Sequence, residues 1–252
     1  MGKVINALSK KDDMKLGAVT FLDVLGWKGI WQKDEYALSN LKDIVKESSN
    51  IAEKYTKQLN EKYKQLYVNK DTVETKVVSI SDTIVLLSIA DDEFKDAIEL
   101  HARICSKIIE YALSKGIPLR GAISYGKFNE SDRIMVGPAI DEAAAWHEST
   151  DWIGVILTPS AQFYLGNIYV KNVITYKNIP FKKGTRGLNK CVSWDYGDRD
   201  RLNKLFIDKG PHMQEIAPKY LNTLEFLNRD KKQDKSEAVE VYNSLHKIKL
   251  IR

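Results

Sequence analysis

Two aspartates in the sequence have the surroundings of metal-binding carboxylates. Asp23 lies inside an apolar, strand-forming run at residues 17–25, where an unpaired carboxylate would carry a heavy desolvation penalty. Asp82 separates two further strand-forming runs, 72–78 and 83–89, which predicts a hairpin with Asp82 at its tip. If the first strand lies beside this hairpin, the two carboxylates approach each other and suit hard divalent ions that carry phosphates. For Asp23 alone, an ion pair with Lys or Arg is the alternative.

The elements that must position these carboxylates read as an α+β domain. A charged amphipathic stretch at residues 33–66 predicts one long helix or two joined helices. A second helix is expected at 91–115, a strand at 119–125 and an Ala-rich helix at 139–147. Shorter elements follow: a strand at 152–157, a helix at 159–165 and a strand at 168–176. This order fits a ferredoxin-like fold with helices packed on one face of a mainly antiparallel sheet, although order alone admits other α+β folds.

The composition is that of a folded domain. Of the 252 residues, 43% are hydrophobic and 29% are charged, which argues against disorder. The net charge of +5 is compatible with an anionic ligand, but the interleaved charges and the lack of a recognition motif disfavour nucleic acid. Cys105 and Cys191 lack zinc-ligand spacing and read as free thiols. Without an apolar run of about 20 residues, a cytoplasmic protein is expected, with no membrane partner.

Four short segments match, in order, the motifs of one enzyme family. Residues 21–27 are similar to a first-strand motif Phe-x-Asp-Ile-x-Gly-Phe, and Asp82 takes the place of an aspartate at a hairpin tip. Residues 119–126 are similar to an Arg-Val-Gly-Ile-x-x-Gly strand and 137–143 to a Gly-x-x-Val-Asn-x-Ala helix. In this combination the chain resembles the class III nucleotidyl cyclases. The resemblance implies a catalytic domain at 1–196, followed by a helical C-terminal appendage at 197–252 without a family counterpart.

The resemblance also implies a two-metal mechanism. Two divalent cations, Mn²⁺ or Mg²⁺, bridge the aspartates and the triphosphate, and the 3′-hydroxyl attacks the α-phosphate and expels pyrophosphate. It implies metal ligation at Asp23, Val24 and Asp82. Arg120 is then a catalytic contact to the triphosphate. An ion pair at the start of a strand is the alternative for Arg120.

Phosphate and base contacts follow from the same resemblance. The backbone N–H groups of residues 25–27 would donate to phosphate, and a basic loop at 180–187 is similar in position to a family loop that reaches the phosphates. A solvated turn is the alternative for that loop. Polar groups near the hairpin and the strand end could bind a base edge. The substrate-binding candidates are Leu25, Gly26, Trp27, Ser79, Tyr125, Asp141, Lys182, Lys183 and Arg186.

Departures from the family pattern bear on the substrate. The position of the purine-reading Lys is Val78, and the transition-state Asn and Arg of the helix align with Asp141 and Ala145. A Gly-x-Ala-x-x-Glu-Ala helix followed by Trp-Ile-Gly-Val resembles the bacterial pyrimidine (uridylate or cytidylate) cyclases of Pycsar antiphage defence. That resemblance implies a UTP or CTP substrate, with UTP preferred, and a separate effector that reads the cyclic product. It also implies a homodimer, because each family site is built across two chains.

Two other functions fit the same residues. A catalytically silent nucleotide-binding regulatory module would keep both aspartates and lose turnover with the helix Arg, and Ala145 favours it. A nuclease or a polymerase-like palm would share the two carboxylates. The strand at 119–126 and the Ala-rich helix fit the cyclases better. A cyclase that makes a purine product stays open.

Overall fold

The protein is described by a computed structural model, in which residues 14–25, 35–66, 73–90, 94–131, 134–182, 187–208, 214 and 216–229 are placed. These residues form one sheet with the strand order β2-β3-β1-β4-β6-β8-β7, and β5 pairs with β4. The strands are β1 (Lys15–Val24), β2 (Glu74–Ile80), β3 (Thr83–Ile89), β4 (Leu119–Ser131), β5 (Ile134–Val136), β6 (Gly154–Leu157), β7 (Val173–Thr175) and β8 (Lys190–Val192). The helices are α1 (Ala37–Leu66), α2 (Phe94–Ser114), α3 (Pro138–Trp146), α4 (Pro159–Leu165), α5 (Arg199–Asp208) and α6 (Ala217–Leu227).

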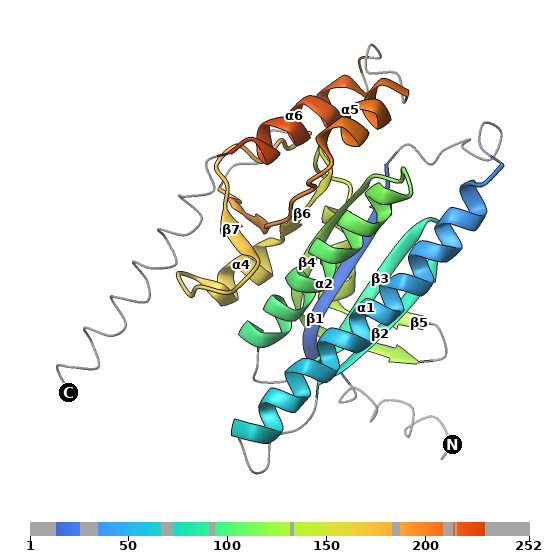
Figure 1. The fold of residues 1–252 in the computed structure, drawn as a ribbon. Helices are drawn as coiled ribbons and strands as arrows, with labels where there is room; N and C mark the ends of the chain where they lie inside the picture. Colours follow the sequence, from blue (N-terminus) through green and yellow to red (C-terminus); the bar gives the residue numbers. More distant parts are fainter. Residues whose placement is uncertain are drawn as a thin grey trace, which may run out of the picture.

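Helices cover both faces of the centre of the sheet. In Figure 1, α1 and α2 lie side by side over one face, while α3 packs against β1 and β4 and joins a second apolar cluster. The strand pairs are antiparallel except for β4 and β6, which are parallel. The predicted α+β fold with a mainly antiparallel sheet is therefore confirmed. The expected placement of the helices on one face was wrong, because Ala139, Ile140 and Ala143 of α3 bury apolar side chains against the second face.

Strand β1 lies inside the sheet, between β3 and β4, and both of its faces are buried. Leu22 and Val24 belong to the main core under α1 and α2, whereas Val19 and Phe21 belong to the second cluster, with α3. Successive side chains of a strand point to opposite faces, so Asp23 shares the α3 face with Phe21. Burial on both faces explains why residues 17–25 read as a continuous apolar run.

The predicted hairpin and long helix are present, and two strands differ from expectation. One helix, α1, spans the whole of 37–66, and the turn between β2 and β3 holds Asp82 beside Ser81, whose φ is 56°. Strand β4 continues beyond residue 125 and pairs with β5, which was not predicted. The strand expected at 168–176 is reduced to β7, because Asn172 takes a φ of 64°, which interrupts an extended backbone.

The described C-terminal helices share the main core with the sheet. Phe206 and Phe226 are buried in it, and the Phe226 ring meets the Trp152 ring edge to face at 4.9 Å. The Ile153 N–H donates to Thr223 Oγ1 at 2.9 Å, which joins α6 to the segment before β6. The division of the chain at 196/197 stays a prediction. Within the placed residues, no helix combines the length and apolar character needed to cross a membrane.

A chain of buried polar side chains joins the helices to the sheet. His101 on α2 bonds through Nδ1 to Thr20 Oγ1 at 2.7 Å and through Nε2 to Ser88 Oγ at 2.8 Å. Ser88 bonds to Thr75, which accepts from Thr56 on α1 at 2.7 Å. Burial lowers the pKa of His101 from 6.5 to about 3. His101 therefore stays neutral in the folded state over the range in which it titrates in the unfolded chain.

This shift predicts acid sensitivity. The unfolded state binds the His101 proton below pH 6.5 and the folded state does so only near pH 3. Between these limits, protonation of this group in the unfolded state should lower the free energy of unfolding by about 1.4 kcal/mol for each unit by which the pH falls. Urea unfolding at pH 7, 6, 5 and 4 measures the slope. His101→Gln, which keeps hydrogen-bonding atoms but does not titrate, should show a shallower slope, and equal slopes would contradict the assignment.

Candidate active site

Asp23 and Arg120 form a buried ion pair across β1 and β4. They are direct partners in the antiparallel register, where opposed side chains on one face lie about 4.5–5.5 Å apart at Cβ. Arg120 Nε and Nη2 donate to Asp23 Oδ2 at 3.2 and 3.1 Å, and each side chain is only 9% exposed. Arg120 Nη1 donates to the carbonyls of Glu148 and Thr150, both at 3.3 Å. The guanidinium is thus fixed between the sheet and the segment that follows α3.

His147 and Glu148 complete a cluster around Asp23. One ligand atom from each of the three residues lies within 4.8 Å of the others. His147 packs against Phe21, with ring centroids 5.7 Å apart. The Glu148 carboxylate lies 3.5 Å from Arg120 Nη2 and 3.8 Å from His147 Nε2. Our sequence analysis did not select either residue; the only signal was a His-Glu pair after the Ala-rich helix.

Asp82 lies at the edge of this cluster. It precedes Thr83, the register partner of Asp23. Burial raises the pKa of Asp23, Arg120 opposes that rise, and the negative charges of Glu148 and Asp82 add to it. The structure therefore places the two predicted aspartates within electrostatic reach of each other, and desolvation is the largest cause of the raised pKa of Asp23.

The donor set of the cluster fits a divalent cation. Carboxylate oxygens suit Mg²⁺ and Mn²⁺, and an imidazole nitrogen suits transition metals. Arg120 bonds only to Oδ2 of Asp23, so within the described chain Oδ1 accepts no hydrogen bond. Val24 follows with its side chain buried in the core at 3% exposure, so it could offer only its backbone carbonyl.

Among the predicted phosphate contacts, Lys182 lies near the cluster. Burial lowers its pKa, and the nearby positive charge of Arg120 lowers it further. The backbone N–H of Lys182 donates to the Ser149 carbonyl oxygen at 2.9 Å. The Leu25 N–H instead donates to Pro118 O at 2.9 Å, so it is not free for phosphate while that bond persists. Gly26, Trp27, Lys183 and Arg186 lie outside the described residues.

Three predicted substrate-binding residues are not brought to Asp23. Tyr125 lies five positions along β4 from Arg120, about 16 Å away, and its hydroxyl donates to Ala90 O at 3.1 Å inside the main core. Val78 packs on the α3 face. Because Ser79 is the next residue of the strand, the Ser79 side chain lies on the other face. Asp141 is exposed in the first turn of α3, about 9 Å along the helix axis from His147.

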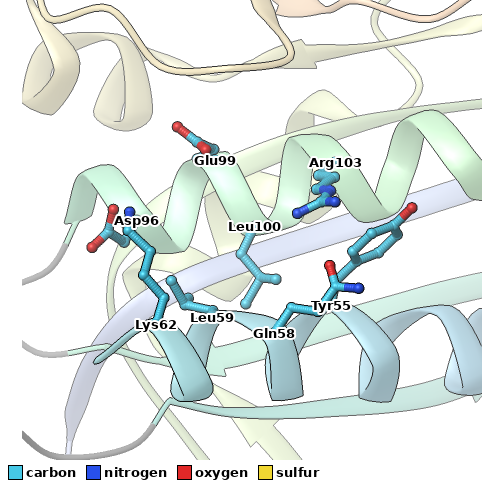
Figure 2. Close-up of a pocket in the computed structure, with 8 residues that line it drawn as sticks. All are labelled: Tyr55, Gln58, Leu59, Lys62, Asp96, Glu99, Leu100 and Arg103. Carbon is cyan, nitrogen blue, oxygen red and sulfur yellow. The ribbon is translucent and has the colours of Figure 1, made fainter. Parts of the chain in front are cut away.

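A surface hollow between α1 and α2 lies on the face of the sheet opposite to Asp23. Figure 2 shows side chains of both helices around it. The Arg103 guanidinium lies 4.1 Å from the centre of the Tyr55 ring. Asp96 accepts a 2.6 Å hydrogen bond from Tyr63. These interactions explain the hollow as part of the contact between the two helices.

The Asp23/Arg120 pair gives a test of the electrostatics. Arg120→Met should lower the free energy of unfolding by about 3–5 kcal/mol at pH 7, because it leaves a buried carboxylate unpaired. Adding Asp23→Asn to that variant should recover a large part of the loss, since no unpaired charge remains. Chemical unfolding of both single variants and the double variant measures the coupling. Simple additivity of the two single effects would show that the pair is not coupled.

Comparison with known proteins gives structural matches alone, since no family model and no curated protein matches the chain. The catalytic core of a rhodopsin-guanylyl cyclase with converted specificity, in complex with ATPalphaS, is 14% identical, with a TM-score of 0.50 over 72% of this chain and 96% of that chain. An adenylate/guanylate cyclase/hydrolase from Silicibacter pomeroyi is 14% identical, with a TM-score of 0.42 over 71% of this chain and 95% of that chain. A bacterial light-regulated adenylyl cyclase is 13% identical, with a TM-score of 0.42 over 77% of this chain and 58% of that chain. At this identity the first match establishes the fold: the chain has the α+β fold of a nucleotide cyclase catalytic core.

Proposed function

We propose that this chain is a metal-dependent nucleotidyl cyclase that converts a nucleoside triphosphate to the 3′,5′-cyclic nucleotide and pyrophosphate. The observation that carries the proposal is the position of Asp23, buried at the end of β1 and within electrostatic reach of Asp82, on a fold shared with a cyclase catalytic core. The Glu148 and Asp82 carboxylates both act on Asp23, which has Arg120 as its ion-pair partner, and this arrangement favours the binding of further cations. A triphosphate with its divalent ions supplies them.

The proposed roles follow from the contacts of each side chain. Asp23 and Asp82 would hold the divalent ions, with the backbone carbonyl of Val24 as a further candidate. When bound, such ions lower the pKa of the attacking 3′-hydroxyl and neutralise the phosphates. Arg120, held by Asp23 Oδ2 and two backbone carbonyls, would present fixed positive charge beside the reacting phosphate. Lys182, beside Arg120, begins the basic loop proposed to contact phosphate.

For the base we propose a pyrimidine, with UTP as the preferred substrate. Val78, in the position of the purine-reading Lys, packs against the apolar cluster on the α3 face and offers no hydrogen bond. The cyclic pyrimidine would then serve as a cytoplasmic signal in antiviral defence, read by a separate effector protein. The same proposal includes a homodimer. The apolar side chains of Ile134 and Val136 on β5, 67% and 49% exposed, are suited to such a contact.

A silent nucleotide-binding module is the second candidate. The helix position that carries a transition-state Arg in the family is Ala145, which is exposed on α3 and offers no charge. Such a module predicts thermal stabilisation by nucleotide without release of pyrophosphate. Stoichiometric pyrophosphate above a metal-free control would exclude it.

Incubation of the purified protein with UTP, CTP, ATP or GTP and Mn²⁺ tests the reaction and the base together. We expect cyclic UMP and pyrophosphate. Asp23→Ala and Asp82→Ala should each reduce the rate by about 100-fold or more, since even outer-shell changes at metal sites cost about 10–100-fold. Asp43→Ala on α1 is the matched carboxylate control and should retain the rate. Full activity in either site variant would refute the mechanism, whereas a purine product would refute only the base.

The basic loop is tested by kinetics. Lys182→Ala should raise KM for the triphosphate, with a lost charged hydrogen bond worth about 1.5–3 kcal/mol before solvent screening reduces it. The double variant Lys183→Ala, Arg186→Ala should act in the same direction. Lys177→Ala, an exposed lysine nearby in the sequence, is the control. Unchanged KM and kcat in folded variants would identify the loop as a solvated turn.

A further inference from the structure

We infer that His147 supplies an imidazole nitrogen to the metal centre, so that Nε2 of His147 and a carboxylate oxygen of Glu148 bind a divalent transition metal together with Asp23. The inference rests on the proposed function only in taking Asp23 as a metal ligand. It adds two ligands from the end of α3 that neither the motif resemblance nor the two-aspartate scheme includes. The observations that support it are a fixed imidazole tautomer, the spacing of the donors and the burial of Asp23.

The tautomer of His147 is set by its backbone contact. Nδ1 lies 2.6 Å from the carbonyl oxygen of Ala144, and a carbonyl oxygen can only accept a hydrogen bond. Nδ1 therefore carries the proton, and in the neutral ring the lone pair is on Nε2. Metal-binding histidines typically donate their other ring N–H to a carbonyl or a carboxylate in this way. The imidazole is thus prepared to act as a ligand through Nε2.

Spacing brings this nitrogen into reach of the two carboxylates. The ligand atoms of Asp23, His147 and Glu148 all lie within 4.8 Å of one another. Three ligands that bind one ion tetrahedrally at about 2.1–2.2 Å lie about 3.5 Å apart. His147 Nε2 and Glu148 Oε1 are already 3.8 Å apart, and shifts of about 1 Å in the remaining separations would close the site. His147 and Glu148 are adjacent in the chain, and Glu148 at 57% side-chain exposure can adjust.

The surroundings hold the imidazole while leaving it accessible. The His147 side chain is 17% exposed, and its ring packs against Phe21. Arg120 engages Oδ2 of Asp23 and leaves Oδ1 without a hydrogen bond from the described residues. A nitrogen and two carboxylates form a donor set that favours Mn²⁺ and other transition metals over Mg²⁺, which prefers oxygen. The inference therefore predicts a metal preference as well as a ligand.

Pulsed electron paramagnetic resonance of Mn²⁺ bound to the full chain without nucleotide tests the ligand directly. We expect modulation from a directly coordinated ¹⁴N nucleus in the unmodified protein and its loss in His147→Ala. Titration followed by the signal of free Mn²⁺ should show affinity lower by about tenfold or more in that variant. Competition with Mg²⁺ should show that the preference for Mn²⁺ over Mg²⁺ is smaller in His147→Ala than in the unmodified protein. Glu148→Gln should weaken Mn²⁺ binding and keep the nitrogen signal.

A matched control separates ligation from a purely structural role. Ser149 Oγ donates to Trp146 O at 2.7 Å, the same kind of bond to the third preceding residue that His147 makes. Ser149→Ala should retain Mn²⁺ affinity and the nitrogen signal. If His147→Ala does not fold, His147→Asn replaces it, and the spectrum of the unmodified protein decides in either case. No nitrogen modulation in that protein, or modulation that persists without His147, would overturn the inference.

The same samples distinguish this inference from the proposed function. Triphosphate turnover without a nitrogen signal would leave the cyclase proposal standing and remove the imidazole ligand. A nitrogen signal that depends on His147, without turnover of any of the four nucleotides, would keep the metal site and remove the cyclase. Absence of Mn²⁺ binding to the unmodified chain would overturn the inference directly.

Discussion

The buried pair between Asp23 and Arg120 ties the chemistry of the site to the register of the sheet. The two residues are opposite each other on adjacent strands, and a slip of one residue would move every side chain of β1 to the other face. Both faces of β1 are packed, one under α1 and α2 and the other under α3. The apolar pattern of the strand therefore fixes its register, and the register in turn fixes Asp23 beside Arg120, Glu148 and His147.

Energetics give a reason to regard this pair as functional. An isolated buried ion pair is weak support for stability, because well-packed apolar residues of similar volume are often as stable or more so. Here the desolvation of Asp23 outweighs the effect of Arg120 on its pKa, and two further carboxylates act in the same direction. Under the proposed function, the negative charge around Asp23 is kept for cations that arrive with a ligand.

Local patterns in the sequence predicted the parts of the fold that depend on local forces. The hairpin around Asp82, the long α1 and the buried β1 all follow from periodicity and turn residues within each segment. Contacts between distant segments were not predictable in this way. Periodicity gives a buried face to α6 but does not say that Phe226 will meet Trp152. Similarly, alternate residues of β4 point to opposite faces of the sheet, and a motif does not say which face α2 covers. The side to which Tyr125 points could therefore not be predicted.

The His147/Glu148 part of the site was missed for the same reason. Nothing near residue 147 in the sequence indicates β1, and only the packing of α3 across β1 brings the imidazole to Phe21 and Asp23. The departure from the family pattern that the sequence shows on this helix is at position 145, where Ala145 aligns with the transition-state Arg. That position is exposed, and it lies about 200° around the helix from 147.

The difference in direction matters for how charge is controlled at the site. An Arg at 145 would extend from the exposed side of α3. His147 instead turns inward at the end of α3, toward carboxylates that already lie together. An imidazole there would add a donor to an ion that Asp23 is proposed to bind. Under the proposed function, an Arg at 145 and the imidazole of His147 are therefore not equivalent, because the imidazole would control charge through an ion at the end of β1.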